Sequence, residues 1–167
     1  MKKALIIINV NKDESMDLAQ EVTQFLRLKN IDSDRIMYDG FVDNIPFDEY
    51  DFVVTLGGDG MVLYAARNAV ALGIPVFPIN LGQFGFIAAI QPSEWSGALE
   101  DFLAGKSSYE ERSMMNADVI RDGKIVYSSL GLNDVAISSD KAASIISLTI
   151  DYDKSLLCHL KGDGVIF

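Results

Sequence analysis

Two glycines, an aspartate and a third glycine stand together at residues 57–60, after the apolar run 52–56 and before the helical pattern 61–72. Glycines let a phosphate approach the backbone N–H groups, and a helix dipole adds about 0.3–1 kcal/mol at an exposed site. A carboxylate beside phosphates is repulsive unless it binds a cation or accepts a proton from a reacting hydroxyl. The pattern predicts Asp59 as a catalytic residue beside a phosphate loop of Gly57, Gly58 and Gly60, with an ordinary Asp-Gly turn as the alternative.

Two further segments are candidates for binding. Residues 80–86 follow the next apolar run, so their backbone and the rings of Phe84 and Phe86 are candidates for the wall of a nucleotide pocket, unless the loop only buries its aromatics.

Asn133 and Asp134 place an amide beside a carboxylate. Neighbours on a regular strand face opposite ways, so both meet one ligand only at a strand end or bulge, which Gly131 permits. An Asx turn is the alternative.

Cysteine and histidine do not support a metal or nucleophile site. The single cysteine, Cys158, excludes an internal disulfide and fits a reducing cytoplasm, and with one histidine there is no Cys/His metal cluster. On a strand Cys158 and His159 face opposite ways, so we interpret both as structural. The patterns GxxxxGK[ST], GxGxxG, HExxH and GxSxG are all missing. We therefore predict no metal-ligating residues in this chain.

The elements that position these residues change character along the chain. Residues 1–105 alternate apolar runs (4–9, 52–56, 76–79, with a short strand at 35–38) with helical patterns (16–29, 61–72, 93–104), which predicts a doubly wound α/β nucleotide-binding domain. Ser15 is the expected N-cap of the first helix. Residues 106–167 show period-two alternation, which predicts the start of an antiparallel all-β domain, with a tight turn at Asp122-Gly123.

Composition limits the partners. The 167 residues carry 14 Lys and Arg against 24 Asp and Glu, and the net charge of −10 argues against nucleic acid. Residues 61–90 contain Arg67 as their one charge, but glycines and prolines interrupt the run, so we expect no membrane span.

Five blocks together resemble the NAD kinase family. They are residues 55–60 (TLGGDG), 78–86 (PINLGQFGF), 111–115 (ERSMM), 132–135 (LNDV) and 162–164 (GDG), in the family's order and rough spacing. The resemblance covers essentially the whole chain and the first half to two-thirds of a typical member. In the family a TPTGSTAY-like segment follows the last block, so we expect the sequence to continue beyond Phe167 and expect residues 1–167 alone to be inactive.

The resemblance implies phosphorylation of the adenosine-ribose 2′-hydroxyl of NAD by ATP or polyphosphate, with a divalent cation such as Mg²⁺, in a cytoplasmic homo-oligomer (dimer or tetramer). Asp59 matches the proton acceptor and Gly60 a backbone contact to the dinucleotide. Asn133 and Asp134 match the pair that binds the ribose hydroxyls, and Phe86 matches the aromatic beside the adenine. Ser144, Lys161 and Asp163 match further NAD-contacting positions. The sequence departs from the family at Met61, Tyr64 and Gln83.

Two other functions stay open at this point. A lipid kinase can carry the same GGDG loop, but this chain offers no basic amphipathic helix for a membrane surface. A catalytically silent nucleotide-binding or sensor module is the alternative outside enzymes.

Overall fold

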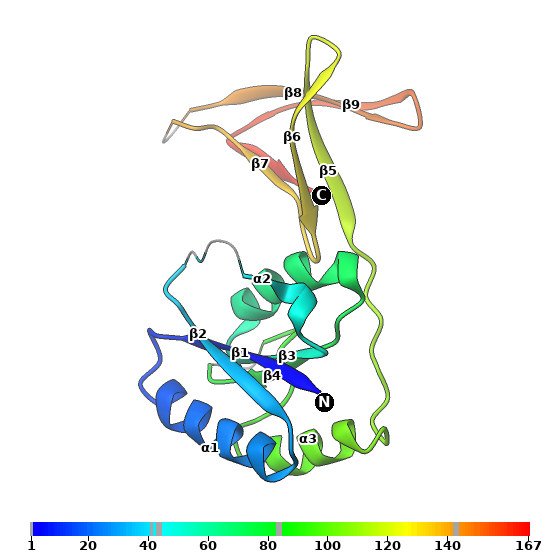
Figure 1. The fold of residues 1–167 in the computed structure, drawn as a ribbon. Helices are drawn as coiled ribbons and strands as arrows, with labels where there is room; N and C mark the ends of the chain where they lie inside the picture. The colour runs from blue at the N-terminus through cyan, green and yellow to red at the C-terminus, as the bar shows by residue number, and fades with distance from the viewer. Residues whose placement is uncertain (1, 41, 43–44, 83–84, 142–143) are drawn as a thin grey trace. The chain divides into compact units, whose positions relative to one another are not determined.

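A computed structural model describes residues 2–40, 42, 45–82, 85–141 and 144–167 of the chain (Figure 1). The chain divides into two compact units, Met1–Glu111 and Arg112–Phe167, and each is described by itself. The assignment of nucleotide binding to residues 1–105 and of NAD binding to residues 106–167 stays a prediction.

A four-stranded parallel sheet forms the centre of the first unit, in the order β2-β1-β3-β4. Its strands are β1 (Lys3–Asn9), β2 (Asp32–Tyr38), β3 (Phe52–Gly57) and β4 (Val76–Asn80). In the register of the sheet Ile7 lies beside Ile36 and Thr55. The central strands β1 and β3 are buried along nearly their whole length, as their uninterrupted apolar sequences require.

Helices cover both faces of this sheet. Side chains alternate between faces along a strand, so Ile6 and Ile8 of β1 pack in one core with α1 (Ser15–Leu28) and α3 (Trp95–Leu103). Leu5 and Ile7 pack in the other core with α2 (Asp59–Ala69). Figure 1 shows α1 and α3 on one side of the strands and α2 on the other. The doubly wound α/β fold is confirmed.

The first two helix starts change the roles predicted for Ser15 and Asp59, and α3 begins at Trp95, two residues after its predicted start. Ser15 is the first residue of α1 and not its N-cap: its hydroxyl donates to the carbonyls of Asn9 (2.8 Å) and Lys12 (2.7 Å), so it holds the preceding turn and not the helix N–H groups. The helix predicted at 61–72 begins at Asp59 and passes into the 3₁₀ turn η2 (Val70–Leu72). Asp59 therefore belongs to the first helical turn and not to the loop.

The second unit consists of antiparallel strand pairs, as predicted. A hairpin joins β5 (Met115–Arg121) to β6 (Lys124–Gly131), and Asp122 (φ 50°) and Gly123 (φ 73°) have the positive φ that a type I′ turn requires. A second hairpin joins β8 (Ile146–Tyr152) to β9 (Ser155–Gly162). The third pair is β7 (Ala136–Ser138) with β10 (Gly164–Ile166).

The last strand, β10, is paired along one edge: it pairs with β7, with Val165 beside Ile137. Val135 and Phe167 extend this ladder by exchanging two backbone hydrogen bonds of 3.0 and 2.9 Å. One edge of the strand is therefore satisfied.

Among the helices in the described ranges, none is long and apolar enough to span a bilayer.

The remaining short element is η1 (Phe47–Glu49), a 3₁₀ turn before β3. Its Phe47 side chain is buried in the core that contains α2.

Candidate functional site

A cavity of about 370 Å³ lies where β1, β3 and β4 end. Parallel strands bring their carboxyl ends to one edge of the sheet, where ligands bind in open α/β folds. Three segments that follow these strands contribute to the wall, together with the end of β2. The described lining residues are Asn9, Lys12, Tyr38, Gly58, Asp59, Gly60, Met61, Gly82 and Gly85.

The three glycines of the predicted phosphate loop differ in position. A β-carbon added to Gly58 or Gly60 would meet nothing within 4 Å, so both residues present open backbone to the cavity. Gly57 is buried at the end of β3, where a β-carbon would overlap Met61 Cγ and lie 3.2 Å from Asn9 Cβ. Gly57 therefore serves the packing of Met61 in this structure, and its part in binding phosphate stays a prediction.

Asp59 is anchored on the loop that follows β4. Its Oδ2 accepts the N–H of Phe86 (2.9 Å), and its Oδ1 accepts the N–H groups of Ile87 (3.2 Å) and Ala88 (2.9 Å). A carboxylate in the first turn of a helix is also favoured by the helix dipole. These contacts give the carboxylate a defined position at the cavity, as a positioned acid or base requires.

Gly85 makes this anchoring possible. A β-carbon at residue 85 would lie 2.7 Å from Cγ and 2.9 Å from Oδ2 of Asp59, closer than real side chains pack. Gly82, in the same loop, has only ordinary neighbours: its added β-carbon would be 3.4 Å from Asn80 Oδ1. Glycine at residue 85 is therefore required by the carboxylate, while residue 82 has room for a methyl group.

Lys12 supplies the positive charge of the cavity. The Ser15 hydroxyl bonds to the Lys12 carbonyl, and the Lys12 N–H donates to the Asn9 carbonyl (3.3 Å), so a tight turn holds the residue at the end of β1. Its side chain is half-buried. If a β-carbon were added to Gly82, it would lie 3.9 Å from the Lys12 Nζ. No other cation is found among the described residues that line the cavity.

Tyr38 is the aromatic residue among the described residues that line the cavity. The rings of Tyr38 and Tyr64 have centroids 4.6 Å apart, and the Tyr64 hydroxyl donates to the Val42 carbonyl (3.0 Å). Phe86 contributes its backbone N–H, while its side chain is 95% exposed. Its proposed place beside an adenine stays a prediction. Gln83 and Phe84 lie outside the described residues.

The other predicted site residues belong to the second unit. Asn133 and Asp134 lie in the bend between β6 and β7, and the Asn133 amide donates to Asp134 Oδ2 (3.1 Å). Because the two residues lie outside a regular strand, their side chains are not forced to opposite faces. Ser144 precedes β8, and Lys161 is an exposed residue of β9.

Asp163 lies at the far end of the β7–β10 ladder. Its carbonyl accepts the N–H of Ser139 (3.0 Å), whereas Asp134 precedes the Val135–Phe167 end of the same ladder. Val135 and Ser139 are four residues apart, so at about 3.4 Å per residue the two ends are roughly 14 Å apart. Asp134 and Asp163 therefore lie near opposite ends of this ladder.

Cys158 and His159 show no nucleophile–base pairing. In the ladder Cys158 lies beside Ile150 and His159 beside Thr149, so their side chains take opposite faces. The His159 Nδ1 is 3.0 Å from Thr149 Oγ1. This arrangement suits the structural interpretation of both residues.

Comparison with known proteins finds sequence relatives. The model of the ATP-NAD kinase N-terminal domain matches residues 39–107. A NAD kinase of Treponema denticola is 40% identical over 99% of this chain, and one of Treponema pallidum is 39% identical over 98%. Over nearly its whole length the chain is therefore similar to NAD kinases. It spans 59% and 54% of the lengths of these two relatives.

The fold is similar to that of a solved kinase structure. The crystal structure of yeast NADH kinase complexed with NADH matches 99% of this chain with a TM-score of 0.72 at 17% identity, over 57% of its own length. A NAD kinase of Solibacter usitatus is 34% identical over 99% of this chain. These matches agree with an α/β unit followed by antiparallel strands.

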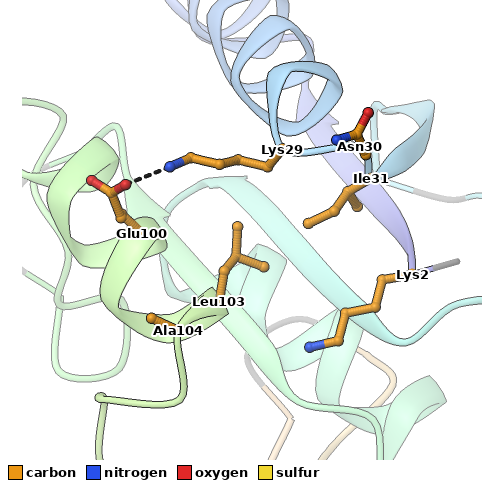
Figure 2. A pocket seen from close by; sticks show the side chains of 7 residues that line it. All are labelled: Lys2, Lys29, Asn30, Ile31, Glu100, Leu103 and Ala104. Atoms are coloured by element: carbon orange, nitrogen blue, oxygen red, sulfur yellow. Dashed lines mark hydrogen bonds and ion pairs between the residues drawn. The ribbon is translucent and has the colours of Figure 1, made fainter.

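A second cavity, of about 430 Å³, lies at the amino ends of the strands (Figure 2). Its lining residues are Lys2, Lys29, Asn30, Ile31, Glu100, Leu103 and Ala104. Figure 2 shows the Lys29 side chain extended toward Glu100, with which it forms an ion pair. The Glu100 pKa is lowered because the Lys29 ammonium donates a hydrogen bond to it. This cavity lies away from the edge where a NAD kinase-like α/β unit is expected to bind ligands.

The sequence prediction missed Asn9, Lys12 and Tyr38 as lining residues. The signal was present, because parallel strands place the residue after each strand at one edge. Applied to β1 and β2, this rule would have added those residues to the glycine loop.

Proposed function

We propose that this protein phosphorylates the 2′-hydroxyl of the adenosine ribose of NAD, with ATP or polyphosphate as donor, yielding NADP. The observation that carries the proposal is the Asp59 carboxylate, anchored by three backbone N–H groups at a cavity bordered by Gly58 and Gly60. The similarity to NAD kinases supports the substrate class.

In the proposed reaction the ribose hydroxyl oxygen attacks the terminal phosphorus of the donor. The new O–P bond forms as the bond to the bridging oxygen breaks, and the hydroxyl proton passes to Asp59. Phosphoryl transfer has a loose transition state, so the protein chiefly positions the reactants and neutralises charge. A carboxylate held by backbone donors suits that task because its position does not depend on flexible side chains.

Residues of the second unit are proposed to bind NAD. Asn133 and Asp134, joined by their side-chain hydrogen bond, accept and donate to the ribose hydroxyls. Ser144, Lys161 and Asp163 are proposed as further contacts. In the first unit Phe86 is proposed to place its exposed ring against the adenine.

A divalent cation such as Mg²⁺ is proposed to arrive with the donor. The described residues include no group of three His, Cys, Asp or Glu side chains that would hold a metal ion. Mg²⁺ usually keeps several waters and binds through one or two carboxylates plus substrate phosphates. This chemistry suits a metal-complexed nucleotide as the substrate. Cytoplasmic location and a dimeric or tetrameric state are part of the same proposal.

A lipid kinase and a silent nucleotide-binding module are the competing functions, and no observation favours either. NADP formation separates all three, because a lipid kinase phosphorylates a different acceptor and a silent module none.

The test uses a chimera, since the chain spans 54–61% of its relatives. Residues 1–167 are joined to the part of the Treponema denticola NAD kinase that follows the aligned region. We expect this chimera to form NADP from NAD with ATP or polyphosphate, and the 167-residue chain to bind NAD without useful turnover. A folded chimera that phosphorylates neither NAD nor NADH with any of these donors would refute the proposal.

A further inference from the structure

The Lys12 ammonium is half-buried and has no ion-pair or hydrogen-bond partner in the part of the chain that the structure describes. The other lysine of this unit with comparable exposure, Lys3, contacts two carboxylates, Asp34 and Glu49. Removing a charge from water is costly unless an opposite charge compensates. The cavity beside the Lys12 ammonium therefore suits an anion.

Hydrogen bonds hold the turn that carries Lys12. The buried Ser15 hydroxyl bonds to both carbonyls of the turn, of Asn9 and of Lys12. The Asn9 side chain accepts the N–H of Asn11 (3.0 Å). A preorganised cation binds an anion with less loss of conformational freedom than a mobile one.

The residues around Lys12 suit a chain of phosphate groups as the bound anion. Gly58 and Gly60 present open backbone to the same cavity, so phosphate oxygens can approach closely there. A net charge of −10 leaves a polyanion dependent on such a local cation. Asp59, the proposed proton acceptor, lines the same cavity, so a phosphate held by Lys12 would stand beside the reacting group.

We propose that Lys12 binds the phosphate chain of the donor, a nucleoside triphosphate or an inorganic polyphosphate. This assignment rests on the proposed function. The pyrophosphate of NAD has the same chemistry, but the residues proposed for NAD lie mainly in the second unit, which carries its own cation, Lys161. Lys12 belongs to the first unit, with Asp59 and the glycines.

Calorimetry on the 167-residue chain tests the assignment without requiring turnover. Inorganic tripolyphosphate, ATP and NAD are titrated separately into the parent chain, Lys12→Gln and Lys12→Arg. Lys106→Gln is the matched control, since it removes the same charge from an exposed lysine that does not line the cavity. Circular dichroism and thermal unfolding verify that each variant is folded.

We expect Lys12→Gln to weaken tripolyphosphate and ATP about tenfold to a hundredfold, the worth of a charge-assisted hydrogen bond. Lys12→Arg should retain most of the affinity, and NAD binding should change little. Equal affinities of Lys12→Gln and the parent, an equal loss in Lys106→Gln, or no tripolyphosphate binding by the folded parent would each overturn the assignment.

A loss confined to NAD would also overturn it, by assigning Lys12 to the dinucleotide. Failure of the proposed function is a separate result, because the chimera would then form no NADP while Lys12-dependent tripolyphosphate binding persisted.

Discussion

Replacing Gly85 by alanine should release the Asp59 carboxylate from its loop. The new β-carbon would lie 2.7 Å from Cγ and 2.9 Å from Oδ2 of Asp59, so the carboxylate or the loop must move. Movement breaks hydrogen bonds from Phe86, Ile87 and Ala88, whose N···O distances are 2.9 to 3.2 Å. The charge of the carboxylate is unchanged, so the variant isolates its position.

The size of the effect follows from these bonds. A hydrogen bond to a charged group contributes about 1.5–3 kcal/mol net. Asp59 is only half-buried, so water partly replaces the lost donors, and we expect a loss equivalent to about one such bond. Because about 1.4 kcal/mol corresponds to a tenfold change in an equilibrium constant, the equilibrium population of the locally opened loop should rise about 10–100-fold.

Amide hydrogen exchange of residues 86, 87 and 88, followed by NMR, measures this opening directly. Gly82→Ala is the matched control in the same loop, because its β-carbon would meet Asn80 Oδ1 at 3.4 Å and Lys12 Nζ at 3.9 Å, both ordinary contact distances. Both changes restrict the unfolded backbone alike, by about 0.4–1 kcal/mol, so their difference reports the displaced carboxylate. Equal exchange rates in Gly85→Ala and Gly82→Ala would refute the anchoring of Asp59 on this loop.

Four further changes have expected outcomes. Asp59→Asn should lower NADP formation by the chimera about 10²–10⁴-fold, because an amide cannot accept the proton. Asp134→Ala should weaken NAD by about 1.5–3 kcal/mol and ATP less, by calorimetry, because it removes charge-assisted bonds to ribose hydroxyls. Thr55→Val should raise the free energy of unfolding by about 1 kcal/mol in denaturant titration, since the buried Thr55 hydroxyl has no hydrogen-bond partner among the described residues. Lys3→Met should lower the unfolding temperature more near pH 7 than near pH 2.5, because the Lys3 ammonium, 2.8 Å from Asp34, lowers the pKa of that carboxyl below 3.8.

The sign of the last effect follows from the linkage between folding and protonation. A carboxyl whose pKa is lowered in the folded state adds stability above its unfolded pKa and loses it as the pH falls through the folded value. The Lys3 pKa, raised to about 12 chiefly by the Asp34 hydrogen bond, keeps the pair charged across neutral pH. An unfolding-temperature difference independent of pH would contradict this account.

The first three of these predictions also have contrary outcomes. A chimera with Asp59→Asn that retained more than about a third of the parental rate would assign Asp59 a structural role alone. Equal losses of NAD and ATP in Asp134→Ala would mean that the Asn133-Asp134 pair only shapes the bend. A less stable Thr55→Val would show that the hydroxyl is satisfied, for example by a buried water.

The fold was predictable where a residue's neighbours are set by the local pattern. The strand β1 follows from an uninterrupted apolar run, and the Asp122-Gly123 turn from its residue types. The edge strand β2 was predicted too short, because its first residues, Asp32 and Ser33, are polar and only one side of the strand is paired to the sheet. Ser15 was misassigned because its hydroxyl bonds to carbonyls, and sequence preference alone cannot distinguish these partners from N–H groups.

The site was predictable in its chemistry and not in its contacts. The sequence indicated Asp59 and the open glycines by type and placement. The bonds from Phe86, Ile87 and Ala88 to Asp59 join residues 27 to 29 positions apart, and they depend on how the loop after β4 returns to the sheet. The place of Lys12 likewise depends on the parallel order of β1 and β3.

The contact between Gly57 and Met61 limits how this sequence can vary over evolutionary time. Any side chain at residue 57 would overlap Met61 Cγ, and Met61 is itself almost fully buried. A larger residue at 57 becomes tolerable only after residue 61 has become smaller, and a change at 61 alone leaves a cavity. In sequences that descend from this one, a smaller side chain at residue 61 should therefore appear before a larger side chain at residue 57.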